Sequence, residues 1–123
     1  KNEIKVINDQ FSSPTYSKDI ASVVKNIIER LDMNISYRNT YHLSSDVYLS
    51  WYEFSEMIKQ SLQKENLAKI IPVGSDQFDT DAKRPKNSAL DPSKLYNDFN
   101  ISLPKCNESL IRFFQDLEID FRR

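Results

Sequence analysis

The sequence has 123 residues, 39% of them hydrophobic, and its 17 basic and 18 acidic side chains leave a formal net charge of −1. This length predicts one hydrophobic core and a single domain over residues 1–123. The balanced charge argues against binding to nucleic acid or to an anionic membrane surface. Because no apolar run approaches the ~20 residues of a membrane span, we expect a soluble protein.

The cysteine and glycine counts further narrow the class of protein. Cys106 is the only cysteine, so no internal disulfide can form, and a reducing, cytoplasmic location fits. Gly74 is the only glycine, where average usage would give roughly eight or nine, so no Gly-rich phosphate loop can be written here. A nucleotide cofactor would need another segment to bind it. The start at Lys1 without a secretory segment suggests a piece of a longer protein.

The chain is predicted to begin with a strand and a polar loop. Alternating residues from Glu3 to Ile7 indicate the strand, which ends in a turn at Asn8 and Asp9. Residues 9–15, fixed by Pro14, form the loop. It is either an ordinary connection or a ligand loop at the carboxyl end of a strand, where α/β proteins tend to place their sites.

A helix is predicted from Ser17, because apolar residues recur there at the three-and-four spacing of one buried face. That face comprises Ile20, Val23, Val24, Ile27, Ile28 and Leu31. Thr15 or Ser17 is expected to cap this helix, and Asp19 stands where the helix dipole favours an anion.

A short strand is predicted at Thr40–Ser44, and it contains His42, the only histidine. A lone histidine inside a strand is more often a structural group than a catalytic base. Without a second histidine nearby it also has no partner for a metal site. We therefore leave His42 out of the candidate site.

The next helix has the most fully specified start in the sequence. Ser50 and Glu53 form a capping box, and the helix is predicted to run to about Asn66. Its buried face is expected to comprise Trp51, Phe54, Met57, Ile58 and Leu62. Trp51 could stack on a base or sugar, although packing in the core is the favoured interpretation.

The remaining segments predict one more strand and two more helices. The strand is Lys69–Val73, an edge strand because of Pro72. Asp91 is expected to cap a short helix that runs to about Phe99, with Pro92 at its first position, and Asn107 to cap the last helix. The buried face of that last helix comprises Leu110, Phe113, Phe114, Leu117 and Phe121. Three or four helices alternating with three short strands indicate an α/β fold.

The segment Ala82–Asp91 is the strongest candidate for a binding site. It places Arg84 beside two lysines, with Asn87 and Ser88 close behind. A guanidinium can offer two parallel hydrogen bonds to one anion, so this set suits a phosphate or diphosphate. On composition alone a solvated basic loop would be the more common interpretation.

Five stretches together carry a resemblance to a known family. They are Val6–Phe11, Ser13–Tyr16, Tyr41–Leu43, Ser50–Phe54 and Arg84–Asp91. In this order and spacing they resemble the carboxy-terminal part of the dTDP-4-dehydrorhamnose reductases, which belong to the extended short-chain dehydrogenase/reductases. The resemblance runs from Ile4 to about Leu110, and it implies the small C-terminal lobe of a Rossmann-type enzyme.

The resemblance implies an NADPH-dependent reductase that reduces dTDP-4-dehydro-L-rhamnose to dTDP-L-rhamnose, in a bacterial pathway of carbohydrate biosynthesis. In that family the N-terminal Rossmann half binds the cofactor and carries a catalytic Tyr-x-x-x-Lys pair. No tyrosine in this chain has a lysine four positions later. We therefore expect the chain to supply no catalytic residue, to be inert alone and to work with such an N-terminal half.

By the same resemblance the lobe closes over a dTDP-sugar. Arg84 is expected to clamp the diphosphate, with Gln10, Asn87 and Ser88 as supporting donors. Some family members form homodimers with Mg²⁺ at the interface, but no ligand set for a metal can be assigned in this sequence. The sequence departs from the family pattern at Ser12, where glycine is usual, and at Cys106, where tryptophan is expected.

Other functions remain open. The chain could belong to another nucleotide-sugar reductase or epimerase. It could come from a non-catalytic relative, such as the regulatory subunit of methionine adenosyltransferase, which acts through protein contact. It could also be a free-standing interaction module. An intact Tyr-x-x-x-Lys pair upstream would separate the enzymes from the non-catalytic relative, and an upstream Rossmann segment would exclude the free-standing module.

Overall fold

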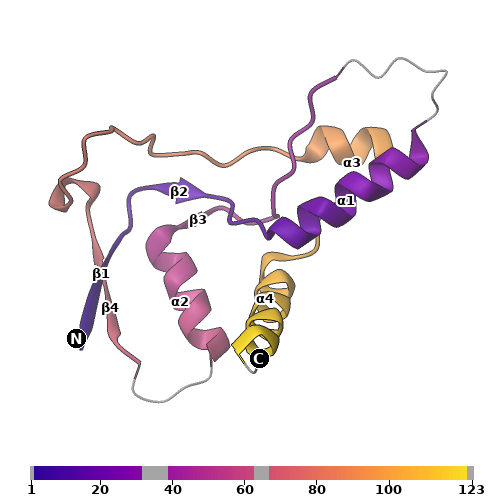
Figure 1. The fold of residues 1–123 in the computed structure, drawn as a ribbon. Coiled ribbons are helices and arrows are strands. Elements are labelled where there is room, and N and C mark those ends of the chain that lie inside the picture. The colour runs from indigo at the N-terminus through magenta and orange to yellow at the C-terminus, as the bar shows by residue number, and fades with distance from the viewer. Residues whose placement is uncertain (1, 32–38, 63–66, 122–123) are drawn as a thin grey trace. The chain divides into compact units, whose positions relative to one another are not determined.

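The computed structural model describes residues 2–31, 39–62 and 67–121, and the side chains up to residue 117 (Figure 1). These residues form two compact units. The first unit comprises Lys1–Pro14 and Val47–Ala89, and the second unit comprises Thr15–Asp46 and Leu90–Arg123. Within the described residues, every helix is too short or too polar to cross a bilayer. That both units make one substrate-binding lobe stays a prediction.

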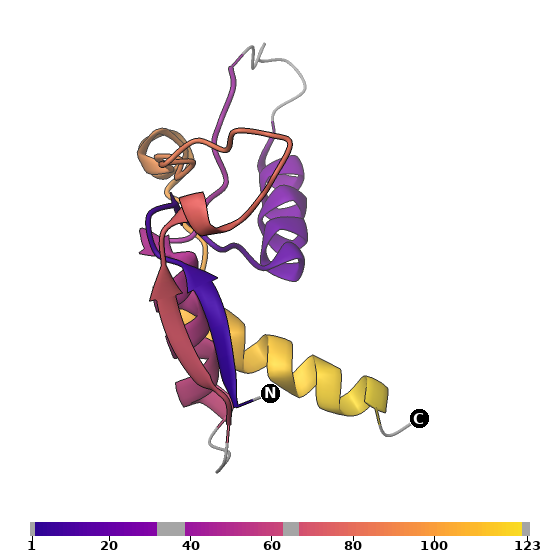
Figure 2. The ribbon, with the colours of Figure 1, turned by 90° about the vertical axis from the view of Figure 1, so that its left-hand side faces the viewer.

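A two-stranded parallel sheet forms one half of the first unit. β1 (Glu3–Ile7) pairs with β4 (Lys69–Val73), in register from Glu3 opposite Lys69 to Ile7 opposite Val73 (Figure 2). Both strands have the predicted bounds. Helix α2 (Trp51–Leu62) packs against both strands, and Val73 is buried beneath it.

A second pairing in the first unit was not predicted. Strand β2 (Phe11–Ser12) lies in the expected polar loop and pairs antiparallel with β3 (Leu49–Ser50). Both strands have only two residues, so neither shows the alternation by which a strand is recognised. The segment that follows β4, after Val73, contains the 3₁₀ turn η1 (Ser75–Gln77).

The start of α2 confirms the predicted capping box. The Ser50 hydroxyl accepts the Glu53 N–H at 3.1 Å, and the Glu53 carboxylate accepts the Ser50 N–H at 2.7 Å. The packing role expected for Trp51 is wrong, since its side chain is 48% exposed. Trp51 is the first residue of α2, and helical side chains point toward the N-terminus of their helix. The predicted end at Asn66 lies outside the described residues.

The second unit is held by a small core between helices. Its helices are α1 (Ser17–Arg30), α3 (Ser93–Phe99) and α4 (Cys106–Phe121). The fully buried residues of the core cluster are Val23, Leu95 and Ile101. The buried face predicted for α1 is too wide, because Val24 and Ile28 are 40% and 62% exposed.

The second half of the predicted α4 face is also less buried than expected. Leu110 is buried, and Phe114 and Leu117 are half-buried. Phe113 is 38% exposed, and its ring contacts Tyr16 edge to face. The side chain of Phe121 lies outside the described residues.

The strand predicted at Thr40–Ser44 is wrong. Residues 39–48 are irregular, although exposed and half-buried residues do alternate from Thr40 to Leu43. Tyr41 and Leu43 pack against the core of the second unit, whereas His42 is exposed. The alternation therefore reflects an extended segment lying on helices rather than pairing with another strand.

Helix α1 starts at Ser17 as predicted, but not with the predicted cap. The N-cap residue is Tyr16, which makes no side-chain capping bond. The Thr15 hydroxyl instead accepts the Ser45 N–H at 3.2 Å. Asp19 lies in the first turn, as the dipole argument requires, but it is buried and therefore needs a partner within the protein.

Helices α3 and α4 show one cap that was predicted and one that was not. Asp91 accepts the Ser93 N–H at 2.9 Å, as expected, although the helix begins one residue after Pro92. Helix α4 begins at Cys106, so the predicted Asn107 cap is wrong. The Cys106 N–H is bound by Asp46 at 3.2 Å, from 60 residues away in the sequence. Four helices and four short strands among the described residues confirm the α/β class.

Candidate functional site

The candidate site begins where the two parallel strands of the first unit end. The Asp9 carboxylate follows β1 and accepts two hydrogen bonds from Ser75, from its N–H and its hydroxyl, both at 2.9 Å. The Asn8 N–H donates to the Val73 carbonyl at 2.9 Å. The loops after β1 and β4 are thus tied together at the carboxyl edge of the sheet, where α/β folds tend to bind ligands.

The charge of Asp9 is stabilised by these bonds. The hydrogen bond from the Ser75 hydroxyl is the main cause that lowers the pKa of Asp9 below 3.8, and the positive charge of Lys86 adds a smaller effect. Asp9 is therefore anionic at neutral pH. A carboxylate fixed in this way serves to hold the loops in place.

The basic loop is held against β2 by backbone hydrogen bonds. The Phe11 N–H donates to the Lys86 carbonyl at 2.8 Å, and the Ser88 N–H donates to the Phe11 carbonyl at 2.9 Å. These bonds make a parallel bridge between Phe11 and Asn87. The bridge places Asn87 and Ser88 beside the residue that follows Gln10.

Two of the predicted donors already use part of their hydrogen-bonding capacity. The Asn87 amide oxygen accepts the Ala89 N–H at 2.9 Å, which leaves its NH₂ group as a donor. The Ser88 hydroxyl donates to the Phe11 carbonyl at 3.3 Å and keeps its lone pairs as acceptors. Gln10 is half-buried, whereas Asn87 and Ser88 are exposed.

Arg84 lies two residues before the segment that the bridge fixes. It is exposed, as are Lys83 and Lys86 on either side of Pro85. No ion pair in the described part of the chain involves any of the three. The structure thus places Asn87 and Ser88 beside Phe11, the residue after Gln10, while Arg84 is exposed. Its role as the diphosphate clamp stays a prediction.

Two aromatic residues that the sequence analysis left out lie beside this loop. The rings of Phe11 and Tyr48 are stacked, with centroids 4.8 Å apart and planes 3° from parallel. Their contact depends on the pairing of β2 with β3, which was not predicted. The sequence shows an aromatic residue in each of these two short segments. It does not show how the segments pair, so the contact between the two rings could not be predicted.

The departure from the family pattern at Ser12 leaves the backbone of this loop unstrained. Ser12 lies in β2, and among the described non-glycine residues only Asn100 has a positive φ, at 53°. A glycine is therefore not needed at position 12 for conformational reasons. Cys106, the second departure, is 4% exposed, and its burial raises the pKa of the thiol.

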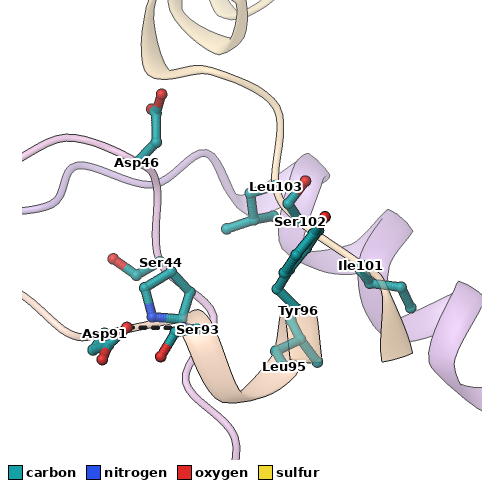
Figure 3. Close-up of a pocket in the computed structure, with 10 residues that line it drawn as sticks. Ser44, Asp46, Asp91, Ser93, Leu95, Tyr96, Ile101, Ser102 and Leu103 are labelled. Atoms are coloured by element: carbon teal, nitrogen blue, oxygen red, sulfur yellow. Dashed lines mark hydrogen bonds between the residues drawn. The ribbon is translucent and has the colours of Figure 1, made fainter. Parts of the chain in front are cut away.

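A cavity of about 250 Å³ in the second unit is a weaker candidate (Figure 3). Leu95 and Ile101 contribute to its largely apolar wall. Its two carboxylates, Asp46 and Asp91, are the caps of α4 and α3. The backbone hydrogen bond from Ser93 also lowers the pKa of Asp91. Both carboxylates of this cavity are thus used by the fold itself.

Two further kinds of site depend on residue types that can be looked for directly, namely a dinucleotide site and a metal site. Gly74 is the only glycine, and it precedes a three-residue 3₁₀ turn rather than a long helix. The chain therefore does not fit the pyrophosphate of a dinucleotide. Across residues 2–31, 39–62 and 67–121 there is no cluster of three or more His, Cys, Asp or Glu side chains that could hold a metal ion.

Comparison with known proteins identifies the family. The model described as RmlD substrate binding domain matches residues 1–119. A dTDP-4-dehydrorhamnose reductase from Aggregatibacter actinomycetemcomitans is 35% identical over 102 residues, which are 78% of this chain and 34% of that protein. The reductase of the same name from Escherichia coli is 27% identical over 121 residues, or 95% of this chain and 40% of that protein.

Solved structures agree with the sequence matches. A dTDP-4-dehydrorhamnose reductase from Clostridium acetobutylicum aligns with a TM-score of 0.80 and 30% identity, over 95% of this chain and 39% of that one. The reductase from Bacillus anthracis, solved in complex with NADP, aligns with a TM-score of 0.77 and 31% identity, over 94% and 38%. This chain thus spans about a third to two fifths of these relatives. The chain belongs to the RmlD substrate binding domain family.

Proposed function

We propose that this chain is the nucleotide-sugar-binding part of an NADPH-dependent dTDP-4-dehydrorhamnose reductase, which produces dTDP-L-rhamnose. The observation that carries the proposal is the family match over residues 1–119. The names of the Aggregatibacter actinomycetemcomitans and Escherichia coli relatives, both dTDP-4-dehydrorhamnose reductases, support the reaction. The NADP in the Bacillus anthracis structure supports the cofactor.

In this enzyme the chain binds and orients the substrate. Arg84 holds the diphosphate, and Gln10, Asn87 and Ser88 supply further polar contacts. The backbone bridge between Phe11 and Asn87 supports this role, because it keeps three of the four residues within one short section of the first unit. Orientation by such fixed groups lowers the entropic part of a reaction barrier.

The cofactor chemistry belongs to another part of the enzyme. When bound, NADPH supplies the hydride that reduces the 4-keto group, and a Rossmann half binds it. The low glycine count of this chain supports that division. We also assign the enzyme to the bacterial cytoplasm and expect a homodimer, which light scattering of the purified protein would test.

The test is an assay of the full-length protein with dTDP-4-dehydro-L-rhamnose. Substrate-dependent loss of NADPH absorbance, with dTDP-L-rhamnose as the product, is the expected result. A protein that binds dTDP without turnover would instead be a non-catalytic relative. Failure to bind dTDP would overturn the proposal.

A further inference from the structure

The stacked pair of Phe11 and Tyr48 lies outside the proposed set of diphosphate-binding residues. Phe11 lies opposite Ser50 in the β2–β3 pair, so Tyr48, two residues before Ser50, is its diagonal neighbour on the same face. Phe11 is half-buried, whereas Tyr48 is 53% exposed. Phe11 covers one face of the Tyr48 ring, and we take the opposite face to be part of the area that stays exposed.

The same face continues from Phe11 to the basic loop. Residues paired in a parallel bridge project their side chains to the same side, so Asn87 is on the face of Phe11 and Tyr48. Tyr48 just before β3, Phe11 in β2 and Asn87 after Arg84 thus form a row on one face. Two steps between neighbouring strands span about 10 Å. This length is comparable to an extended nucleoside diphosphate.

We propose that the outer face of Tyr48, backed by Phe11, is the stacking surface for the pyrimidine base of the bound nucleotide. This inference rests on the proposed function, because it places the base of the same ligand whose diphosphate lies near Arg84. It adds the residues that recognise the nucleoside end, which neither Arg84 nor Gln10 explains.

The geometry favours a flat aromatic ligand over other occupants. The planes of the two rings are 3° apart, so a third ring can continue the stack. Stacking of a base on an aromatic side chain is tolerant of base identity and needs only an open ring face. Tyr48 is already ordered by Phe11, so little side-chain entropy is lost on binding.

The test compares three variants of the full-length protein by calorimetry. Tyr48→Leu removes the ring, Tyr48→Phe retains it, and Phe78→Leu changes another exposed aromatic residue of the same unit, 38% exposed, as a control. Each protein is titrated with dTDP and with inorganic pyrophosphate. Pyrophosphate carries the anionic groups without a base, so it reports on the basic loop alone.

Tyr48→Leu should raise the Kd for dTDP by about fivefold or more and leave the Kd for pyrophosphate unchanged. Tyr48→Phe should bind both ligands as the wild type does, and so should Phe78→Leu. In proton NMR the thymine methyl signal should shift upfield on binding to the wild type and to Tyr48→Phe. The shift should be absent with Tyr48→Leu.

The outcomes separate this inference from the proposed function. If wild type binds dTDP and Tyr48→Leu binds it equally well, the stacking surface is wrong and the nucleotide-binding function stands. If Tyr48→Leu weakens dTDP and pyrophosphate alike, the ring only supports the loop, and the inference is again wrong. A wild type that binds neither ligand would overturn both proposals.

Discussion

The two units use their polar groups in opposite ways. In the second unit the carboxylates are engaged by the fold: Asp19 pairs with Arg112 at 2.6 Å, Asp46 caps α4, and Asp116 pairs with Lys18 at 2.9 Å. In the first unit Asp9 fixes two loops, while Arg84 remains exposed. The second unit thus uses three carboxylates to hold its helices, whereas the first unit leaves the cations of the basic loop exposed, which supports the proposal that a ligand binds there.

The interaction of Asp19 illustrates this division. Its carboxylate also accepts the Ser109 hydroxyl at 2.5 Å, so α1 and α4 are joined by a buried polar group that is fully paired. Tyr16 donates a second hydrogen bond between these helices, to Asp116, and this bond raises the pKa of Tyr16. Tyr16 thus ties the start of α1 to α4.

The largest expected effect is on the core of the second unit. Leu95 is 1% exposed, so Leu95→Ala should lower the free energy of unfolding by about 3 kcal/mol, the middle of the range for such cavities. Urea unfolding followed by circular dichroism measures this loss. The control Ile111→Ala, at a residue 51% exposed, should change stability by less than about 0.5 kcal/mol. Equal losses in both variants would contradict the assignment of the core.

The next effect concerns the ligand rather than the fold. Arg84→Ala should weaken dTDP-sugar binding by about 1.5 kcal/mol, or roughly tenfold in Kd, as expected for a hydrogen bond to a charged group. Stability should be unchanged, because Arg84 is exposed. Calorimetry of the full-length protein measures the Kd.

A matched control for Arg84 lies in the second unit. Lys105 is an exposed cation there, and Lys105→Ala should leave the Kd unchanged. Arg84→Lys should recover only part of the affinity, because lysine keeps the charge but loses the planar fork. If Arg84→Ala and Lys105→Ala have the same Kd for the dTDP-sugar, the assignment of Arg84 to the binding site is wrong.

The features that were predicted correctly from the sequence are those specified within a few residues. The alternation in Glu3–Ile7 and Lys69–Val73 and the Ser50–Glu53 capping box are of this kind. The α/β class followed from the succession of such elements. A structural match at TM-score 0.80 supports the same class.

The missed features depend on contacts between distant segments. The Asp46 cap of α4 joins residues 60 positions apart, and no local pattern specifies it. The stack of Phe11 on Tyr48 depends in the same way on the register of two-residue strands. Arg84 and Asn87 could be named as candidates because a basic, amide-containing loop is visible in sequence. The placement of Asn87 beside Phe11 was not predictable in this way.

A smaller effect is expected at the joint between β1 and α2. The Ser50 hydroxyl is fully buried, donates to the Asn8 amide oxygen at 2.7 Å and accepts the Glu53 N–H. Ser50→Ala should therefore lower stability by about 1 kcal/mol, the typical loss for a helix cap. Fluorescence of Trp51, the only tryptophan in the chain, follows unfolding of the first unit. Ser55→Ala, on an exposed bond of the same helix, should have a smaller effect.

The smallest expected effect is a pH dependence of the first unit. Asp9 has a pKa lowered below 3.8, chiefly by the Ser75 hydroxyl, so the folded state favours its charged form. Its contribution is present above the unfolded pKa and is lost as pH falls through the lower folded value.

Trp51 fluorescence gives the urea midpoint of the first unit at neutral pH and below pH 3.8. Asp9→Asn should be less stable than wild type at neutral pH and should lose less stability on acidification. Asp116→Asn is the matched control, because the pKa of Asp116 is also lowered but its bonds to Tyr16 and Lys18 lie in the second unit. If both variants change the acid response of Trp51 equally, the bond between Asp9 and Ser75 does not stabilise the loops of the first unit in particular.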